Sequence, residues 1–120
     1  MEDVLLTTFQ SELVALGIDG AFRLYKGTKY PYLTYEYFEN NVTHEDGGTE
    51  GELLCEIWTR GAFADLIGIK EKLKKHFKQL FIKVGNNVYY FDFASASPDE
   101  TGDAELKKLQ VNITTKYWGA

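Results

Sequence analysis

One cysteine and two histidines are the side chains of this sequence best suited to nucleophilic catalysis. Cys55 could attack a substrate as a thiolate if His44 or His76 took its proton. Cys55 lies in a stretch of alternating residues from Leu53 to Ile57 that is typical of a buried strand, where a thiol is unreactive. Neither histidine is near it in sequence. We therefore predict no catalytic residue, and a loss of turnover in a Cys55→Ala protein would contradict this.

The histidines also lack the spacing of a metal site. No Cys, Asp or Glu stands at a zinc-ligand spacing from either of them. The run His44-Glu45-Asp46 could bind a cation, but turns favour the same residue types. The glycine-containing motifs of acyl, phosphoryl and hydride transfer are missing as well. We predict neither a cofactor nor a metal.

A lysine-rich segment offers a different chemistry, the attraction of anionic groups. Its lysines are Lys70, Lys72, Lys74, Lys75 and Lys78, in a chain whose net charge is −5. They could hold a phosphate or an acidic protein surface, or they could only keep a surface helix solvated. The uneven charge would also suit a head-to-tail ring, in which the basic face of one subunit meets acidic loops of the next. The acidic total disfavours a nonspecific grip on nucleic acid.

Large aromatic residues crowd the segment YPYLTYEYFENN at residues 30–41. In a strand over residues 32–39, Leu33, Tyr35 and Tyr37 point to one face, and Tyr32 and Phe38 point to the other. Tyr32 and Phe38 could pack across strands against Trp58, or could contact another protein, since tyrosine is enriched at interfaces. We take Tyr32, Phe38 and Trp58, with Lys70, Lys74, Lys75 and Lys78, as candidate interface residues.

Two amphipathic helices are predicted from apolar residues that recur every three or four positions. The first covers residues 2–17, with Leu5, Phe9 and Leu13 in its stripe and Gly17 as its stop. The second carries the stripe from Leu66 to Leu80 among the lysines.

Strands are predicted at residues 22–25, 32–39, 52–59, 81–84, 88–93 and 108–117, from alternating or β-favouring residues. The second and third should pair as a hairpin, and Gly85-Asn86-Asn87 marks a tight turn. We predict one α+β domain over residues 1–120, with two helices on one face of a mixed or antiparallel sheet of about five strands. Polar, mobile loops are expected at residues 40–51 and 94–105.

The sequence resembles the tail terminator, or tail-completion, proteins of long-tailed phages and prophages. The resemblance lies in the amino-terminal helix, the strand YPYLTYEYFEN, the segment GELLCEIWTRG with Ile57-Trp58 near its end, the helix ADLIGIKEKLKKHF and the alternating closing strand LKKLQVNITTKYWG. It covers most of the 120 residues.

This resemblance implies a non-enzymatic structural protein that forms a ring, commonly a hexamer, at the head-proximal end of the tail. Its partners would be other copies, the tail tube and the head connector. DNA would pass through the ring without specific contacts, and no membrane would be involved. The protein would be found in the virion, and in the host cytoplasm during assembly. The alternative is a small cytosolic binding domain in which the aromatic strand and the lysine helix hold an anionic ligand or a protein partner.

Overall fold

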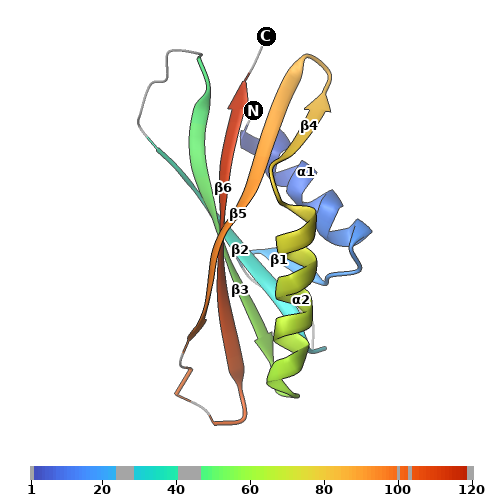
Figure 1. The fold of residues 1–120 in the computed structure, drawn as a ribbon, viewed down its shortest axis with the longest axis vertical. Coiled ribbons are helices and arrows are strands. Elements are labelled where there is room, and N and C mark those ends of the chain that lie inside the picture. The colour runs from blue at the N-terminus through green and yellow to red at the C-terminus, as the bar shows by residue number, and fades with distance from the viewer. Residues whose placement is uncertain (1, 24–28, 41–46, 100, 103, 119–120) are drawn as a thin grey trace.

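The computed structural model describes residues 2–23, 29–40, 47–99, 101–102 and 104–118, which form one six-stranded sheet and two helices (Figure 1). In chain order the elements are α1 (Glu2–Ala15), β1 (Gly20–Phe22), β2 (Tyr32–Glu39), β3 (Thr49–Thr59), α2 (Phe63–His76), β4 (Leu80–Val84), β5 (Asn87–Asp99) and β6 (Lys107–Trp118). The α+β class is as predicted.

The strand order in the sheet is β1-β2-β3-β6-β5-β4. β1 runs parallel to β2, and every other neighbouring pair is antiparallel. The predicted hairpin of β2 and β3 is confirmed, with Leu33 opposite Ile57 and Tyr37 opposite Leu53. The count of about five strands is wrong, because short β1 adds a sixth at the edge of β2. Of the strand predicted at residues 22–25, positions 24 and 25 lie outside the described residues.

The first helix forms as its stripe predicts. Leu5, Phe9 and Leu13 are fully buried, and the chain leaves the helix at Gly17, whose φ of 74° suits a residue without a side chain. The second helix is shorter than its pattern indicated. It ends at His76, and Leu80 belongs to β4. Between them Gln79 adopts a positive φ, and its backbone N–H donates to Asp92.

The predicted loop at residues 94–105 is largely a strand. β5 continues to Asp99 and pairs with β6 throughout, past an irregularity between Phe93 and Ser95. Pro98 is tolerated because β4 pairs only with residues 87–91 of β5, which leaves the later part of β5 at a sheet edge. The loop predicted at residues 40–51 is also too long, since β3 begins at Thr49, and residues 41–46 lie outside the described part.

Both helices lie on the same side of the sheet, and the core is between them and the strands (Figure 1). Its centre is aromatic. Phe9 of α1 packs against Tyr35, Phe77 and Phe91, with ring centroids 4.9, 5.2 and 6.0 Å away. No helix in the described part of the chain is long and apolar enough to cross a membrane. The other side of the sheet carries no helix in the described part of the chain.

Candidate functional site

The sheet side turned away from the helices is the main candidate surface, and we call it the open face. Because side chains alternate along a strand, the even-numbered residues of β2, β3 and β6 lie on it, while odd-numbered ones such as Leu33, Cys55 and Val111 are buried under the helices. The strand register aligns these residues in rows across the sheet. Tyr32 and Phe38 lie on the open face, as the alternation predicted, and Trp58 lies there as the cross-strand partner of Tyr32.

Tyr32 and Trp58 lie together in a cluster near one end of the open face. They are direct cross-strand partners with stacked rings 6.3 Å apart, and Tyr30 adds a third ring 5.3 Å from Tyr32. Cations cover both ends of the cluster, since the Arg60 guanidinium lies 5.9 Å from the Tyr30 ring and the Lys108 ammonium lies 4.8 Å from the Trp58 ring. The cross-strand packing considered from the sequence is therefore real, and it leaves Tyr32 and Trp58 half-buried.

Lys108 also organises the charges beside this cluster. Its ammonium lies 3.0 Å from Asp99 on β5 and 3.4 Å from Glu56 on β3. Partial burial disfavours the charged ammonium, but the hydrogen bond to Asp99 and the two carboxylates outweigh it, so the pKa of Lys108 is raised. These carboxylates are therefore compensated within the chain.

Phe38 stands apart from the cluster, about 20 Å along β2 from Tyr32 at the usual strand rise. Its side chain is 52% exposed and lies directly opposite Glu52 of β3. Glu36 precedes it on the same face of β2. Both glutamates are exposed, and neither has an ion-pair partner in the described part of the chain. This exposed ring between two uncompensated carboxylates is hereafter the Phe38 knob.

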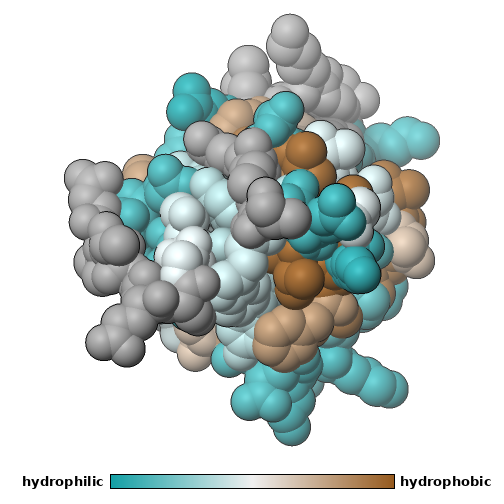
Figure 2. Space-filling model, turned by 90° about the horizontal axis from the view of Figure 1, so that it is seen from above, coloured by the Kyte–Doolittle hydropathy of each residue, from teal (hydrophilic) through white to brown (hydrophobic). Residues whose placement is uncertain are grey.

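A second aromatic cluster, which was not predicted, lies where β4, β5 and β6 meet. The ring of Phe81 is 4.6 Å from Tyr90 and 6.5 Å from Trp118, and the Lys116 ammonium covers Trp118 at 5.0 Å. Phe81 is 60% exposed. Figure 2 looks down on the end of the molecule that carries β4 and shows apolar residues gathered there among polar ones. In the sequence, this cluster could have been suspected from Trp118. It is an aromatic residue at a position of β6 where the preceding residues of the same face are polar.

The lysines of α2 lie in the other layer, away from the open face, and Lys78 follows just after the helix ends at His76. Lys72, Lys74, Lys75 and Lys78 are exposed and have no ion pair within the described residues, whereas Lys70 pairs with Glu71 at 3.1 Å. The sequence-based set of interface residues therefore divides between two separate surfaces of the molecule.

Two of these lysines border a depression of about 370 Å³ between the ends of the helices. Its walls are Leu16, Lys72, Lys75 and His76, and we call it the lysine hollow. The His76 Nε2 atom lies 3.1 Å from a carboxylate oxygen of Glu12 on α1, and its ring packs edge-on against Phe77.

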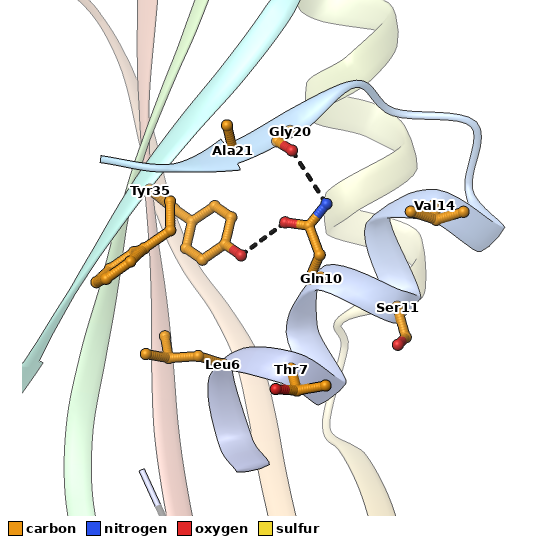
Figure 3. A pocket seen from close by; sticks show the side chains of 9 residues that line it. Leu6, Thr7, Gln10, Ser11, Val14, Gly20, Ala21 and Tyr35 are labelled. Carbon is orange, nitrogen blue, oxygen red and sulfur yellow. Dashed lines mark hydrogen bonds between the residues drawn. The ribbon is translucent and has the colours of Figure 1, made fainter. Parts of the chain in front are cut away.

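A larger groove, of about 680 Å³, runs between α1 and the edge strand β1 (Figure 3). Gln10 spans its floor, accepting a hydrogen bond from the Tyr35 hydroxyl at 2.6 Å and donating one to the Gly20 carbonyl at 3.0 Å. Burial is the main cause that raises the pKa of Tyr35 to about 12. Val14, 66% exposed, lies on the rim.

Cys55 and the histidines do not form a catalytic group in the described residues. Cys55 is fully buried in β3, and burial raises the pKa of its thiol, which disfavours the reactive thiolate. His76 pairs with Glu12, and His44 lies outside the described residues. Within residues the structure describes, no three His, Cys, Asp or Glu side chains gather as metal ligands.

Comparison with known proteins identifies the fold but no family. No family model matches the sequence, and no curated protein does. A solved structure whose name states no function superposes with a TM-score of 0.71 at 14% sequence identity. The match covers 100% of this chain and 97% of that one, so the whole architecture recurs in another protein.

Proposed function

We propose that this chain is a structural protein of a phage or prophage that assembles with its own copies into a ring, commonly of six subunits, at the head-proximal end of the tail. In this role it closes the tail tube and takes part in joining the tail to the head connector. Its work is assembly and not catalysis. The protein resides in the virion, and in the host cytoplasm before assembly.

One observation carries this proposal: the sheet has a covered side and an open side, and the open side bears apolar rings. An antiparallel sheet with a solvated outer face normally carries polar residues there. Here Phe38 is 52% exposed and Phe81 is 60% exposed, and both lie on the open face. Phe81 lies in a cluster with Tyr90 and Trp118, and exposed apolar patches of this kind mark protein contacts in soluble proteins. The resemblance of the sequence to tail terminators supplies the identity of the partners.

The sheet edges support the same reading. β1 and β4 are the two ends of the strand order, and each has a neighbouring strand on one side only. Such edges can pair with another chain or lie against it. A subunit with different surfaces at its two ends is suited to a head-to-tail ring.

Native mass spectrometry and electron microscopy of the purified protein, alone and with tail-tube protein, test the proposal. We expect closed rings of a single size. Mass spectrometry of virions should also detect the chain. A protein that stays monomeric at high concentration with tail-tube protein present, and is missing from virions, would contradict the proposal.

A second candidate function, the binding of an anionic ligand, is favoured by one observation. Lys72, Lys75 and His76 surround a hollow whose size would admit a small anion. Calorimetric titration with inorganic phosphate tests it. Saturable binding that is lost in a Lys72→Glu, Lys75→Glu protein, with ring assembly unchanged, would favour this function over the ring.

A further inference from the structure

The Phe38 knob and the lysine hollow have complementary chemistry. The knob presents one exposed ring between Glu36 and Glu52, and these carboxylates have no ion-pair partner within the described residues. The hollow is lined by the apolar side chain of Leu16 and by Lys72 and Lys75, whose ammonium groups have no ion-pair partner among the described residues. The exposed ring of the knob could therefore pack on the apolar side chain of the hollow, and the carboxylates could pair with the ammonium groups.

The hollow is large enough for the ring. It measures about 370 Å³, and a cavity of about 150 Å³ is enough to hold benzene in a protein. The aliphatic stems of Lys72 and Lys75 can pack along the edges of a phenyl group while their ammonium groups reach outward. An inserted ring would place the two glutamates beside the two lysines.

We infer that Phe38 of one copy inserts into the lysine hollow of the next copy, with Glu36 and Glu52 paired to Lys72 and Lys75 of that copy. This inference rests on the proposed ring and names the surfaces that build it. The knob lies on the open face, and the hollow lies in the helical layer on the other side of the sheet. Such a contact joins two different patches, and it closes into a ring when the rotation between copies allows it.

A second copy fits the hollow better than a small anion does. The apolar Leu16 side chain would gain nothing from phosphate. The knob supplies both an apolar ring and carboxylates, and it belongs to the same chain.

Exchange of the charges tests the contact directly. In one variant Glu36 and Glu52 are both changed to Lys, and in the other Lys72 and Lys75 are both changed to Glu. Each variant alone should self-associate roughly a hundredfold more weakly than the wild type, because like charges then face each other. A mixture of the two variants should form rings of alternating subunits, in which every contact again joins opposite charges.

The variants should keep their fold, since all four positions are exposed. Thermal melting followed by circular dichroism checks this point. Phe38→Ala should weaken assembly as well. Val14→Ala is the control, because it shortens an apolar side chain that is 66% exposed and lies outside both the knob and the hollow, and it should assemble as the wild type does.

Disulfide trapping gives an independent readout. A chain carrying both Glu52→Cys and Lys75→Cys should form a ladder of linked copies upon oxidation, whereas either substitution alone should give none. Cys55 will not interfere, because it is fully buried.

The outcomes separate this contact from the proposed function. Wild-type rings with unchanged assembly of both charge variants, or with no linked ladder, would overturn the contact and leave the ring in place. If the wild type forms no rings, either alone or with tail-tube protein, both the contact and the proposed function are overturned. If phosphate binds in the hollow and the charge-reversed variants still form rings as the wild type does, the hollow is an anion site and the proposed contact is overturned.

Discussion

At the scale of single residues, the structure turns the most reactive side chain of the sequence into part of the core. Cys55 faces the helices from the middle of β3, paired with Tyr35 on one side and Val111 on the other. Burial in apolar surroundings raises the pKa of its thiol because the thiolate would lose its hydration there. The same residue on the open face would have been a candidate nucleophile.

We expect Cys55 to react with thiol reagents only when the protein unfolds. The labelling rate at neutral pH should follow the global unfolding equilibrium, rising with urea as the unfolded fraction rises. Spectrophotometric thiol titration across a urea series measures this. Rapid labelling in the absence of urea, in a protein that retains its circular dichroism spectrum, would show that the thiol is accessible.

Tyr35 should make stability depend on pH in the alkaline range. Its pKa is raised to about 12 from 10.0, chiefly by burial, so the folded state keeps a proton that the unfolded state releases earlier. The contribution of protonated Tyr35 to the free energy of unfolding is therefore complete below pH 10.0, and it is lost as the pH rises towards 12. Urea unfolding at a series of pH values measures the fall in the free energy of unfolding.

The control for this prediction is Tyr35→Phe, which removes the titrating group. It should flatten the alkaline decline and lower stability at neutral pH by about 1 kcal/mol, because the hydrogen bond to Gln10 is lost. An alkaline decline as steep as that of the wild type would mean that other tyrosines, such as Tyr117, cause it.

At the scale of elements, β3 depends on a glycine that lets an aromatic ring cross it. Gly51 pairs with Glu39 of β2 and Thr115 of β6, and a Cβ atom at this position would stand 2.5 to 2.7 Å from atoms of the Tyr37 ring. Tyr37 is only 8% exposed, so its ring has little room to move. The glycine thus permits the packing of a neighbouring strand.

Gly51→Ala should therefore destabilise the protein by about 1 to 3 kcal/mol, the usual cost of overpacking. Gly68→Ala is the matched control, because Gly68 lies in α2 with nothing within 4 Å of an added Cβ atom. It should stabilise the protein by up to about 1 kcal/mol through helix propensity. Chemical unfolding of both variants measures these changes. A Gly51→Ala protein as stable as the wild type would show that the Tyr37 side chain moves to make room for the added methyl group.

At the scale of the whole molecule, charge is divided between the two layers. The lysines of α2 lie in the helical layer, and the strands of the open face carry more carboxylates than ammonium groups. This division gives the domain two unlike sides, which is what repeated head-to-tail contact requires. Oligomers of this chain should consequently be sensitive to salt.

We expect self-association to weaken between roughly 0.1 M and 1 M salt, where the Debye length falls from about 10 to 3 Å. Analytical ultracentrifugation over this range measures the change. The melting temperature of the monomer, taken at a concentration too low for assembly, should change much less, because its core is apolar. Association that strengthens with salt would instead indicate an interface dominated by apolar burial.

The sequence alone determined the elements whose residues repeat with a regular period. The stripe of Leu5, Phe9 and Leu13 defined α1, and the alternation through β6 indicated both the strand and its buried side. The outward position of Phe38 followed from the same alternation. These features are local, because the spacing of apolar residues along a short stretch of chain indicates both the element and its buried side.

The tertiary structure alone decided what those elements meet. β5 extends through Pro98 because β6 pairs with it, and Asp99 finds Lys108 there, so a segment with the composition of a loop became a strand. The second aromatic cluster and the lysine hollow both join residues that are far apart in the chain. Contacts between such distant residues depend on which surfaces the folded sheet brings together, and the periodicity of neighbouring residues does not predict them.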